Sequence, residues 1–376
     1  MSNFDDIRPY HDGEIIAAML RLADSPLLPS MLRYVMPNVD VEVIRKKIRH
    51  IKSSDQFQSE IMVDVVENLI HQTATGWDWS GTEKLEKGKP CLFICNHRDI
   101  VLDAMLLQYI LLKTGHCTSQ IAFGDNLMFD EFATDFWKSN KMFQTGRSGS
   151  TKEQYNRLII VSEYIRHVVT EQKMSVWIAQ SNGRTKNGID VTDPAIIKML
   201  AMSHNDDLVA SLAELNIVPM TVSYEWEPCD KLKALELFAR HKDGYYEKQP
   251  GEDRNSILTG IMQQKGHISY RFCEPVTIEE LYQFRDCQPN AFYKNIASLI
   301  DHRITSNYQL FCNNYIAHDL RSGEQNYVQH YSDQQKEQFL QHMRMIEDSH
   351  VSDYDALRTI FLDIYANPID NKNRKK

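Results

Sequence analysis

The segment CLFICNHRDIVLDAMLLQYILLK, residues 91–113, joins a short apolar run to a long apolar run through a polar turn. Its first five residues follow Pro90 and have the length and composition of a buried strand. Asp99, at the end of the turn, can cap a helix that begins at Ile100, because its carboxylate can accept an amide of the first helical turn. The helix is apolar on nearly every face, so we expect it to be buried.

A single acid, Asp103, lies near the start of this apolar helix. A buried carboxylate without a partner is costly, so Asp103 needs a neighbour that donates to it. The nearest candidate is His97, across the turn, and a histidine oriented by a buried carboxylate acts as a general base near neutral pH. The alternative is that His97 is an ordinary turn residue and that Asp103 accepts backbone amides at the helix start.

The turn Asn96-His97-Arg98, with an acid downstream, resembles block I of the glycerolipid O-acyltransferases, the family of the lysophosphatidate and glycerol-phosphate acyltransferases. Three later segments follow in the order of that family's other blocks: FQTGRS at 143–148, WIAQSNGRTKNG at 177–188 and IVPM at 217–220. The resemblance covers residues 81–276. It implies transfer of a fatty acyl group from acyl-CoA or acyl carrier protein to the hydroxyl of a glycerol-phosphate-type lipid such as 1-acylglycerol-3-phosphate.

The resemblance also implies roles for individual residues. His97 would be the general base and Asp103 its partner, with Asp99 as the less favoured choice. The substrate-binding residues would be Asn96, Arg98, Arg147, Ser148, Asn182, Gly183, Arg184 and Pro219. The family requires no metal, and its acyl donor is a co-substrate rather than a bound cofactor.

The chain departs from the family pattern in two places. The pattern H-x-x-x-x-D would place the acid at Leu102, whereas Asp103 lies one residue further on. We favour Asp103 over Asp99 because a one-residue bulge in the turn can absorb the shift. In the E-G-x-R block, Ser181 or Asn182 replaces the glutamate. This replacement leaves open a lyso-aminolipid or another non-glycerophosphate lipid as acceptor, and also an inactive relative that only binds lipid.

The loop TGRSGSTK, which begins at Thr145, combines small residues with Arg147 ahead of a helix. Ser150 and Glu153 have the spacing of a capping box, which predicts a helix over residues 151–169. Amides at a helix start and an arginine fork both suit a phosphate group. For both Arg147 and the later Arg184, the alternative is an ordinary solvated loop arginine.

A serine hydrolase or thioesterase is the competing enzyme class. The sequence GRSGS at 146–150 partly matches a nucleophile elbow around Ser148. Ser150 stands where that motif has glycine, and no apolar strand leads into it. We therefore favour the acyltransferase.

Short apolar runs alternate with helical segments between residues 81 and 276, which predicts an α/β fold with a layered sheet flanked by helices. The expected strands are 91–95, 118–123, 175–179, 217–224 and 267–272. Pro219 has no amide to donate, so its strand should lie at an edge or begin there. We expect helical regions over 1–80 and 277–366 and a disordered basic tail over 367–376.

The segment VIRKKIRHIK, residues 43–52, is a basic amphipathic helix with its isoleucines on one stripe. It either lies on anionic lipid or packs through the isoleucines as a surface helix. The net charge of -9 argues against nucleic-acid binding. The polar N-terminus, the short apolar runs and seven scattered cysteines predict a cytoplasmic protein that visits the cytoplasmic face of the membrane as a peripheral protein.

Overall fold

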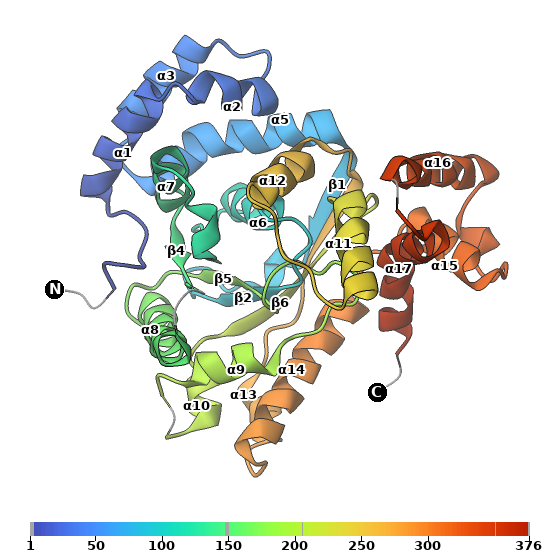
Figure 1. The fold of residues 1–376 in the computed structure, drawn as a ribbon. Coiled ribbons are helices and arrows are strands. Elements are labelled where there is room, and N and C mark those ends of the chain that lie inside the picture. The colour runs from blue at the N-terminus through green and yellow to red at the C-terminus, as the bar shows by residue number, and fades with distance from the viewer. Residues whose placement is uncertain (1–3, 147–149, 205, 350, 375–376) are drawn as a thin grey trace.

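A seven-stranded mixed sheet forms the centre of the molecule in the computed structural model, which describes residues 4–146, 150–204, 206–349 and 351–374 (Figure 1). The strands lie in the order β1 (Ala74–Ser80), β7 (Gly266–Phe272), β6 (Ile217–Tyr224), β2 (Leu92–Cys95), β5 (Val176–Ala179), β3 (Gln120–Phe123) and β4 (Met142–Gln144). Strands β6 and β7 pair antiparallel, and the other neighbouring pairs are parallel. The predicted α/β fold is confirmed.

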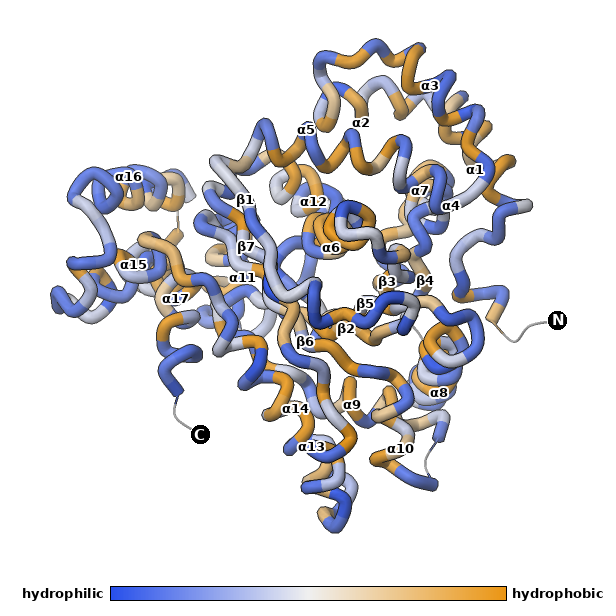
Figure 2. The backbone as a smooth tube through the Cα atoms, turned by 180° about the vertical axis from the view of Figure 1, so that it is seen from behind, coloured by the Kyte–Doolittle hydropathy of each residue, from blue (hydrophilic) through white to orange (hydrophobic). Residues whose placement is uncertain are grey.

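Helices cover both faces of the sheet, and alternate residues of the central strand β2 point into two different cores. Phe93 and Cys95 face one core, whereas Leu92 and Ile94 face the other. The first core is covered by α5 (Val63–Thr73), α6 (Leu102–Lys113), α7 (Glu131–Ser139) and α12 (Glu252–Met262). The second is covered by α8 (Thr151–Thr170), α9 (Pro194–Ala201), α10 (Leu208–Ala213), α13 (Ile278–Tyr282) and α14 (Pro289–Ser306). Figure 2, which is coloured by residue hydropathy, shows hydrophobic residues of β2, β5, β6 and α6 at the centre.

The N-terminal region is helical up to Thr73 and then contributes a strand to the sheet. It contains α1 (Asp12–Asp24), α2 (Leu28–Val35), α3 (Val41–His50) and α4 (Ser54–Phe57), followed by a π-helical turn, Gln58–Met62, that leads into α5. The predicted boundary at residue 80 is therefore corrected, because residues 74–80 form β1 and pair with β7. Within the described residues, no single helix could span a bilayer; α1 and α2 meet that criterion only as a pair, bent by 86°.

The C-terminal helices form a third core on one side of the sheet, to the right in Figure 1. It brings together α11 (Asp230–Asp243), α15 (Cys312–Ser322), α16 (Asp333–Met343) and α17 (Tyr354–Asn373). The disordered tail predicted over 367–376 is wrong for residues 367–373, where α17 continues to Asn373. Its last turns are ordered because Asn367 and Asn371 donate to backbone carbonyls of the loop that follows β5. The remaining 3-10 turns are Thr82–Lys84, Asp125–Leu127, Val328–His330 and Arg344–Ser349.

The strand that contains Pro219 lies in the middle of the sheet, not at an edge as predicted. Strand β6 pairs with β2 on one side and with β7 on the other. The carbonyl oxygen of Pro219 accepts from the amide of Cys273, which lies just beyond the end of β7. The nitrogen of a strand residue faces the same side as its carbonyl, so the missing amide of Pro219 falls where the ladder with β7 ends.

Candidate active site

The turn between β2 and α6 brings His97 and Asp103 together at the carboxyl end of the strand. His97 Nδ1 lies 2.9 Å from Asp103 Oδ2. The Asp103 side chain is fully buried, whereas 13% of the His97 side chain is exposed. The predicted pairing of these two residues is confirmed. Because Nδ1 faces the carboxylate, the Nε2 side of the ring is the one that can exchange a proton with a substrate.

The carboxylate of Asp103 accepts from several donors besides His97. The backbone amides of Arg98 and Asp99 lie 2.6 and 3.0 Å from Oδ2, and Tyr224 Oη lies 2.7 Å from Oδ1. Burial by itself would raise the pKa of Asp103, but these donors outweigh it and hold the pKa below its ordinary value. Asp103 is therefore charged at neutral pH and can stabilise an imidazolium on His97.

The prediction that Asp99 is the N-cap of this helix is wrong, because α6 begins at Leu102 with Val101 as its N-cap residue, but the Asp99 carboxylate does bond backbone amides just ahead of the helix. Its Oδ1 accepts from the amides of Val101 and Leu102 at 2.9 and 2.8 Å. These bonds form a turn ahead of the helix. As a result, α6 begins at Leu102 rather than at Ile100, where it was expected. Asp99 therefore accepts from backbone amides, whereas Asp103 accepts from His97 as well as from backbone amides.

Asn96 and Arg98, which the resemblance assigned to substrate binding, point into the interior. The Arg98 side chain is 5% exposed, and its guanidinium lies 2.6 Å from Asp190 and 3.3 Å from Glu227. Asn96 is fully buried and donates to Asp190 and to the carbonyl of Val222 at 3.1 and 3.0 Å. Both side chains therefore bond inside the protein, and their assignment to substrate binding stays a prediction.

Pro219 is also buried, inside β6, and its assignment to substrate binding likewise stays a prediction. Arg147 and Ser148 lie outside the described residues. The capping box after them is present, since Ser150 Oγ and the Glu153 carboxylate bond each other's backbone amides and α8 begins at Thr151.

The loop after β5 lies against the motif turn. The amide of Thr185 donates to the carbonyl oxygen of His97 at 2.7 Å. Gly183 has a φ of +87° with open space on its Cβ side, and Asn182 is exposed. Arg184 is half-buried, and its Nη1 is buried without a hydrogen-bond partner among the described residues. A buried guanidinium nitrogen without a partner, beside the motif turn, is in a position to bind an anionic group.

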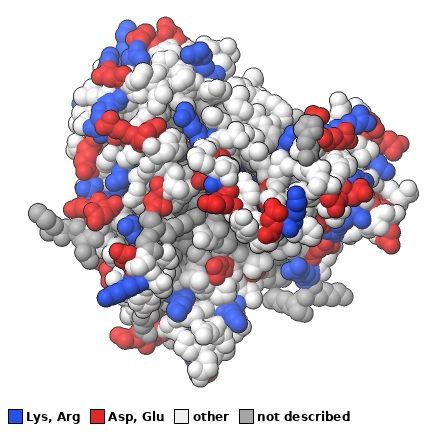
Figure 3. Space-filling view, in the orientation of Figure 1, with Lys and Arg blue, Asp and Glu red and all other residues white. Residues whose placement is uncertain are grey.

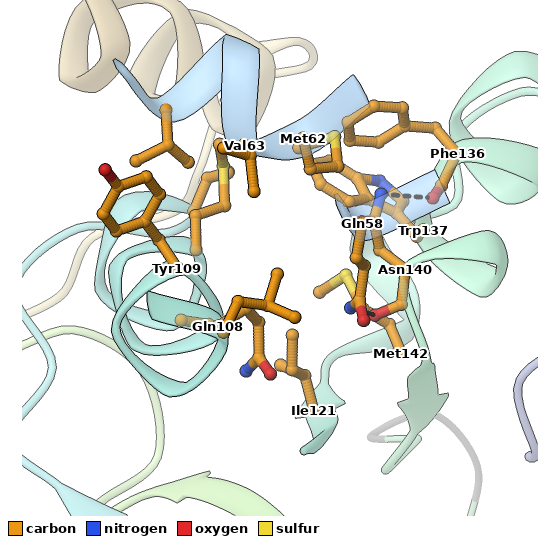
Figure 4. A pocket seen from close by; sticks show the side chains of 15 residues that line it. Gln58, Met62, Val63, Gln108, Tyr109, Ile121, Phe136, Trp137, Asn140 and Met142 are labelled. Atoms are coloured by element: carbon orange, nitrogen blue, oxygen red, sulfur yellow. Dashed lines mark hydrogen bonds between the residues drawn. The ribbon is translucent and has the colours of Figure 1, made fainter. Parts of the chain in front are cut away.

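An apolar slot runs beside α6, away from the motif turn (Figure 4). Val101 and Ala104 line the end nearer to the turn, and Tyr109 and Leu112 line the far end. The opposite wall is formed by α5, the preceding π-helical turn, α7 and β4, with Phe136, Trp137, Asn140 and Met142 among its residues. The segment 127–143, rich in Phe and Met, thus contributes to an apolar slot as well as to the core.

Several residues that shape the site could not be recognised in the sequence. Tyr224 reaches Asp103 from the end of β6, across 121 residues of chain. Asp190, Glu227 and Lys233 form a buried ionic cluster with Arg98. No motif marks these positions, because each acts through a partner far away in the sequence. No group of three or more His, Cys, Asp or Glu in the described part of the chain could hold a metal ion.

Sequence comparisons relate this chain to acyltransferases. Residues 77–223 match the family model described as Acyltransferase. The chain is similar to the glycerol-3-phosphate acyltransferase of Pseudomonas fluorescens (strain SBW25), with 23% identity over 258 residues, 64% of this chain and 29% of the relative. It thus spans less than a third of that relative's length. Among solved structures, the 1-acyl-sn-glycerophosphate acyltransferase PlsC of Thermotoga maritima matches with a TM-score of 0.34 and 10% identity, over 77% of this chain and 94% of that one.

The motif turn lies inside the matched segment, with His97 and Asp103 in hydrogen-bond contact. The later motif loop is joined to it through the amide of Thr185. Residues 77–223 thus match an acyltransferase domain, and the chain is similar to a glycerol-3-phosphate acyltransferase.

Proposed function

We propose that this protein transfers a fatty acyl group from a thioester donor, acyl-CoA or acyl carrier protein, to a hydroxyl of a glycerol-phosphate-type lipid. The observation that carries the proposal is the contact between His97 and the buried, charged Asp103 inside the acyltransferase domain. The similar protein from Pseudomonas fluorescens is named for glycerol-3-phosphate, which supports a glycerol-phosphate-type acceptor.

In this reaction His97 Nε2 removes the proton from the acceptor hydroxyl as its oxygen attacks the thioester carbonyl. The C–S bond then breaks, and the departing thiolate takes the proton from the imidazolium. The new ester and the free thiol are the products, so atoms and charge balance. Asp103 holds the ring in position and stabilises its charged form. General-base assistance of this kind contributes on the order of 10²–10⁴-fold to the rate.

Arg184 is the described residue that best suits the phosphate of the acceptor or of the donor. Its unpartnered Nη1 lies in the loop that bonds the carbonyl of His97 through Thr185. Arg147 and Ser148 stay predictions for the same role. The replaced glutamate of this loop, at Ser181 or Asn182, favours testing a lyso-aminolipid as the second candidate acceptor.

The apolar slot beside α6 supports a fatty acyl donor. It begins at Val101 and Ala104, next to the motif turn, and continues along the helix to Leu112. The slot has a volume of about 30 Å³, so an acyl chain would enter it only as the side chains of its two walls move apart. Burial of each methylene would contribute about 0.8 kcal/mol to binding.

Contact with the cytoplasmic face of the membrane belongs to the same proposal. The three N-terminal helices and their connections expose large apolar side chains, at Ile16, Leu20, Leu27, Tyr34 and Val43. The basic residues of α3 offer less, since Arg45, Lys47 and Arg49 are each paired with an acid. Figure 3 shows charges of both signs side by side over α1 and α3. The apolar side chains, rather than a basic face, would therefore enter the lipid.

The test is release of free thiol from acyl-CoA and from acyl carrier protein by wild type and His97→Ala. Each donor is offered alone, with lysophosphatidate or glycerol 3-phosphate, and with a lyso-aminolipid. Release that requires an acceptor and is lost in His97→Ala supports the proposal and identifies the acceptor. Release without an acceptor would instead indicate a thioesterase. Lipid binding without any release would indicate an inactive relative.

A further inference from the structure

Helix α17 lies outside the matched acyltransferase segment, yet it is connected to both loops of the candidate site. It packs against α11 and α15 at one side of the sheet (Figure 1). One connection runs through buried charges to the turn that carries His97. The other is a direct contact with the loop that carries Arg184.

The first connection begins at Tyr365, which is buried in α17. Tyr365 Oη accepts from the backbone amide of Glu227 at 3.1 Å. The Glu227 carboxylate pairs with Lys233 at 2.5 Å and with Arg98 at 3.3 Å. Lys233 Nζ also donates to the carbonyl oxygen of Arg98 at 2.7 Å. The residue that follows His97 is thus held by both its backbone and its side chain.

The second connection joins α17 to the loop after β5. Asn367 Nδ2 donates to the carbonyl of Asn187 at 2.7 Å, and Asn371 Nδ2 donates to the carbonyl of Gly188 at 3.1 Å. Gly188 also lies directly against the backbone of Ile364, where an added Cβ would be 2.3 Å from the carbonyl oxygen. The position of this loop is therefore set by the surface of the helix.

The buried cluster is balanced in charge and has little freedom to rearrange. Arg98 and Lys233 are 4% and 1% exposed, and Asp190 and Glu227 are 3% and 5% exposed. Two cations therefore face two carboxylates out of contact with water. Removal of any one partner would leave an uncompensated buried charge, so the arrangement fixes the geometry of the turn it surrounds.

The two loops are also bonded to each other, through the amide of Thr185 and the carbonyl of His97. A shift of either loop would change the distance between the catalytic ring and Arg184. We propose that α17 positions both loops of the active site, with Tyr365 and Lys233 as positioning residues for His97 and Asn367 as a positioning residue for the Arg184 loop.

The first test measures hydrogen–deuterium exchange by mass spectrometry on the free protein, without substrate. Tyr365→Phe and Asn367→Ala are compared with Tyr331→Phe. Tyr365 Oη donates to the carboxylate of Asp230 at 2.6 Å, and Tyr331 Oη likewise donates to the carboxylate of Asp319 at 2.9 Å. Tyr331 is therefore a matched control whose bond stays within the C-terminal helices. The reporters are peptides that cover residues 96–103 and 182–190.

We expect several-fold faster exchange in the 96–103 peptide of Tyr365→Phe and in the 182–190 peptide of Asn367→Ala, with the control unchanged. Unchanged exchange in both peptides would overturn the proposal, and so would equal acceleration in the control. If Tyr365→Phe does not fold, the exchange of the 182–190 peptide in Asn367→Ala tests the proposal. That variant should fold, because the Asn367 side chain lies at the helix surface. This readout needs no activity, so it stands even if the proposed acyl transfer fails.

The second test rests on the proposed function and uses kinetics. A misplacement of about 1 Å at an active site can cost about 10²-fold in rate, so Tyr365→Phe should lower kcat by roughly tenfold to 10²-fold. KM should change much less than kcat, because the connection through Glu227 and Lys233 leads to the turn that carries His97 and not to the Arg184 loop. A lower melting temperature with unchanged kcat would show a purely structural role and refute the proposal.

Discussion

Replacement of Asp103 by asparagine separates the charge of this side chain from its shape. In the protein, Oδ2 of Asp103 accepts from His97 Nδ1 and from the amides of Arg98 and Asp99, and Oδ1 accepts from Tyr224 Oη. An asparagine can keep this pattern if its oxygen replaces Oδ2 and its amide group faces Tyr224, whose hydroxyl can accept. Asp103→Asn should therefore fold and lack only the negative charge.

The magnitude follows from the loss of that charge. Hydrogen bonds to charged groups contribute about 1.5–3 kcal/mol and neutral ones about 0.5–1.5 kcal/mol, so the contact with His97 weakens by roughly 1 kcal/mol in the resting protein. The loss is larger in the reaction, because the imidazolium has no counter-charge. General-base assistance contributes on the order of 10²–10⁴-fold, and we expect turnover to fall by about 10²-fold or more.

The matched control is Asp99→Asn, measured in the same thiol-release assay. Its oxygen can still accept from the amides of Val101 and Leu102, so these bonds should weaken by at most about 1 kcal/mol and turnover should stay near that of wild type. The opposite pattern, with Asp99→Asn inactive and Asp103→Asn active, would refute the assignment of the two acids.

Asp103→Asn also changes the acid stability of the protein. The donors around Asp103 hold its folded-state pKa below the unfolded value of about 3.9. Its contribution to stability is therefore present above about pH 4 and is lost as the pH falls through the folded-state pKa. The free energy of unfolding of wild type should decrease more steeply below about pH 4 than that of Asp103→Asn, as measured by urea unfolding. Parallel curves would contradict the ionised state of this carboxyl.

Three further predictions follow from contacts around the site. Burial raises the pKa of Asp301 to about 6. The free energy of unfolding of wild type should therefore fall as the pH rises from about 4 to 6. Asp301→Asn should raise the free energy of unfolding by about 1–2 kcal/mol above about pH 7 and change it little below about pH 4. In Gly260→Ala, the new Cβ would lie 2.1 Å from Asp99 Oδ2, so turnover and melting temperature should both fall. The control Gly13→Ala, in an open position of α1, should be neutral or stabilise by up to about 1 kcal/mol. Leu112→Trp should fill the far end of the apolar slot and shift the preferred donor to shorter acyl chains in a competition assay; an unchanged preference would exclude the slot as the acyl site.

Features that depend on neighbouring residues could be predicted from the sequence. The apolar run before Asn96 forms β2, and the capping box at Ser150 begins α8. The pairing of His97 with Asp103 was inferred from the cost of a buried carboxylate without a partner and from the short distance in sequence between the two residues. In each case the decisive interaction lies within a few residues of the chain, where spacing predicts geometry.

Features that depend on distant residues could not be predicted. Arg98 has the composition of a phosphate-binding residue, but its partners are 92 and 129 residues away and take it into the interior. Pro219 was expected at an edge, because the sequence does not show that β7 ends opposite its nitrogen. The tail after Ala366 has a polar composition typical of disorder, yet Asn367 and Asn371 find carbonyl acceptors in a loop about half the chain away.

The unusual spacing between His97 and Asp103 is explained by the backbone amides of the turn, because Asp99 and Asp103 each accept from a different pair of them. Asp99 accepts from Val101 and Leu102, and Asp103 accepts from the two residues that follow His97, so four buried amides are satisfied by two carboxylates. Asp99 cannot replace Asp103, because its Oδ1 is occupied by the backbone and its Oδ2 lies against Gly260. Leu102, at the position of the family's acid, is buried in the hydrophobic core and closes the turn. The longer spacing therefore leaves His97 and its carboxylate in contact, and any difference in substrate from the glycerolipid O-acyltransferases should arise in the loop after β5, where the glutamate is replaced.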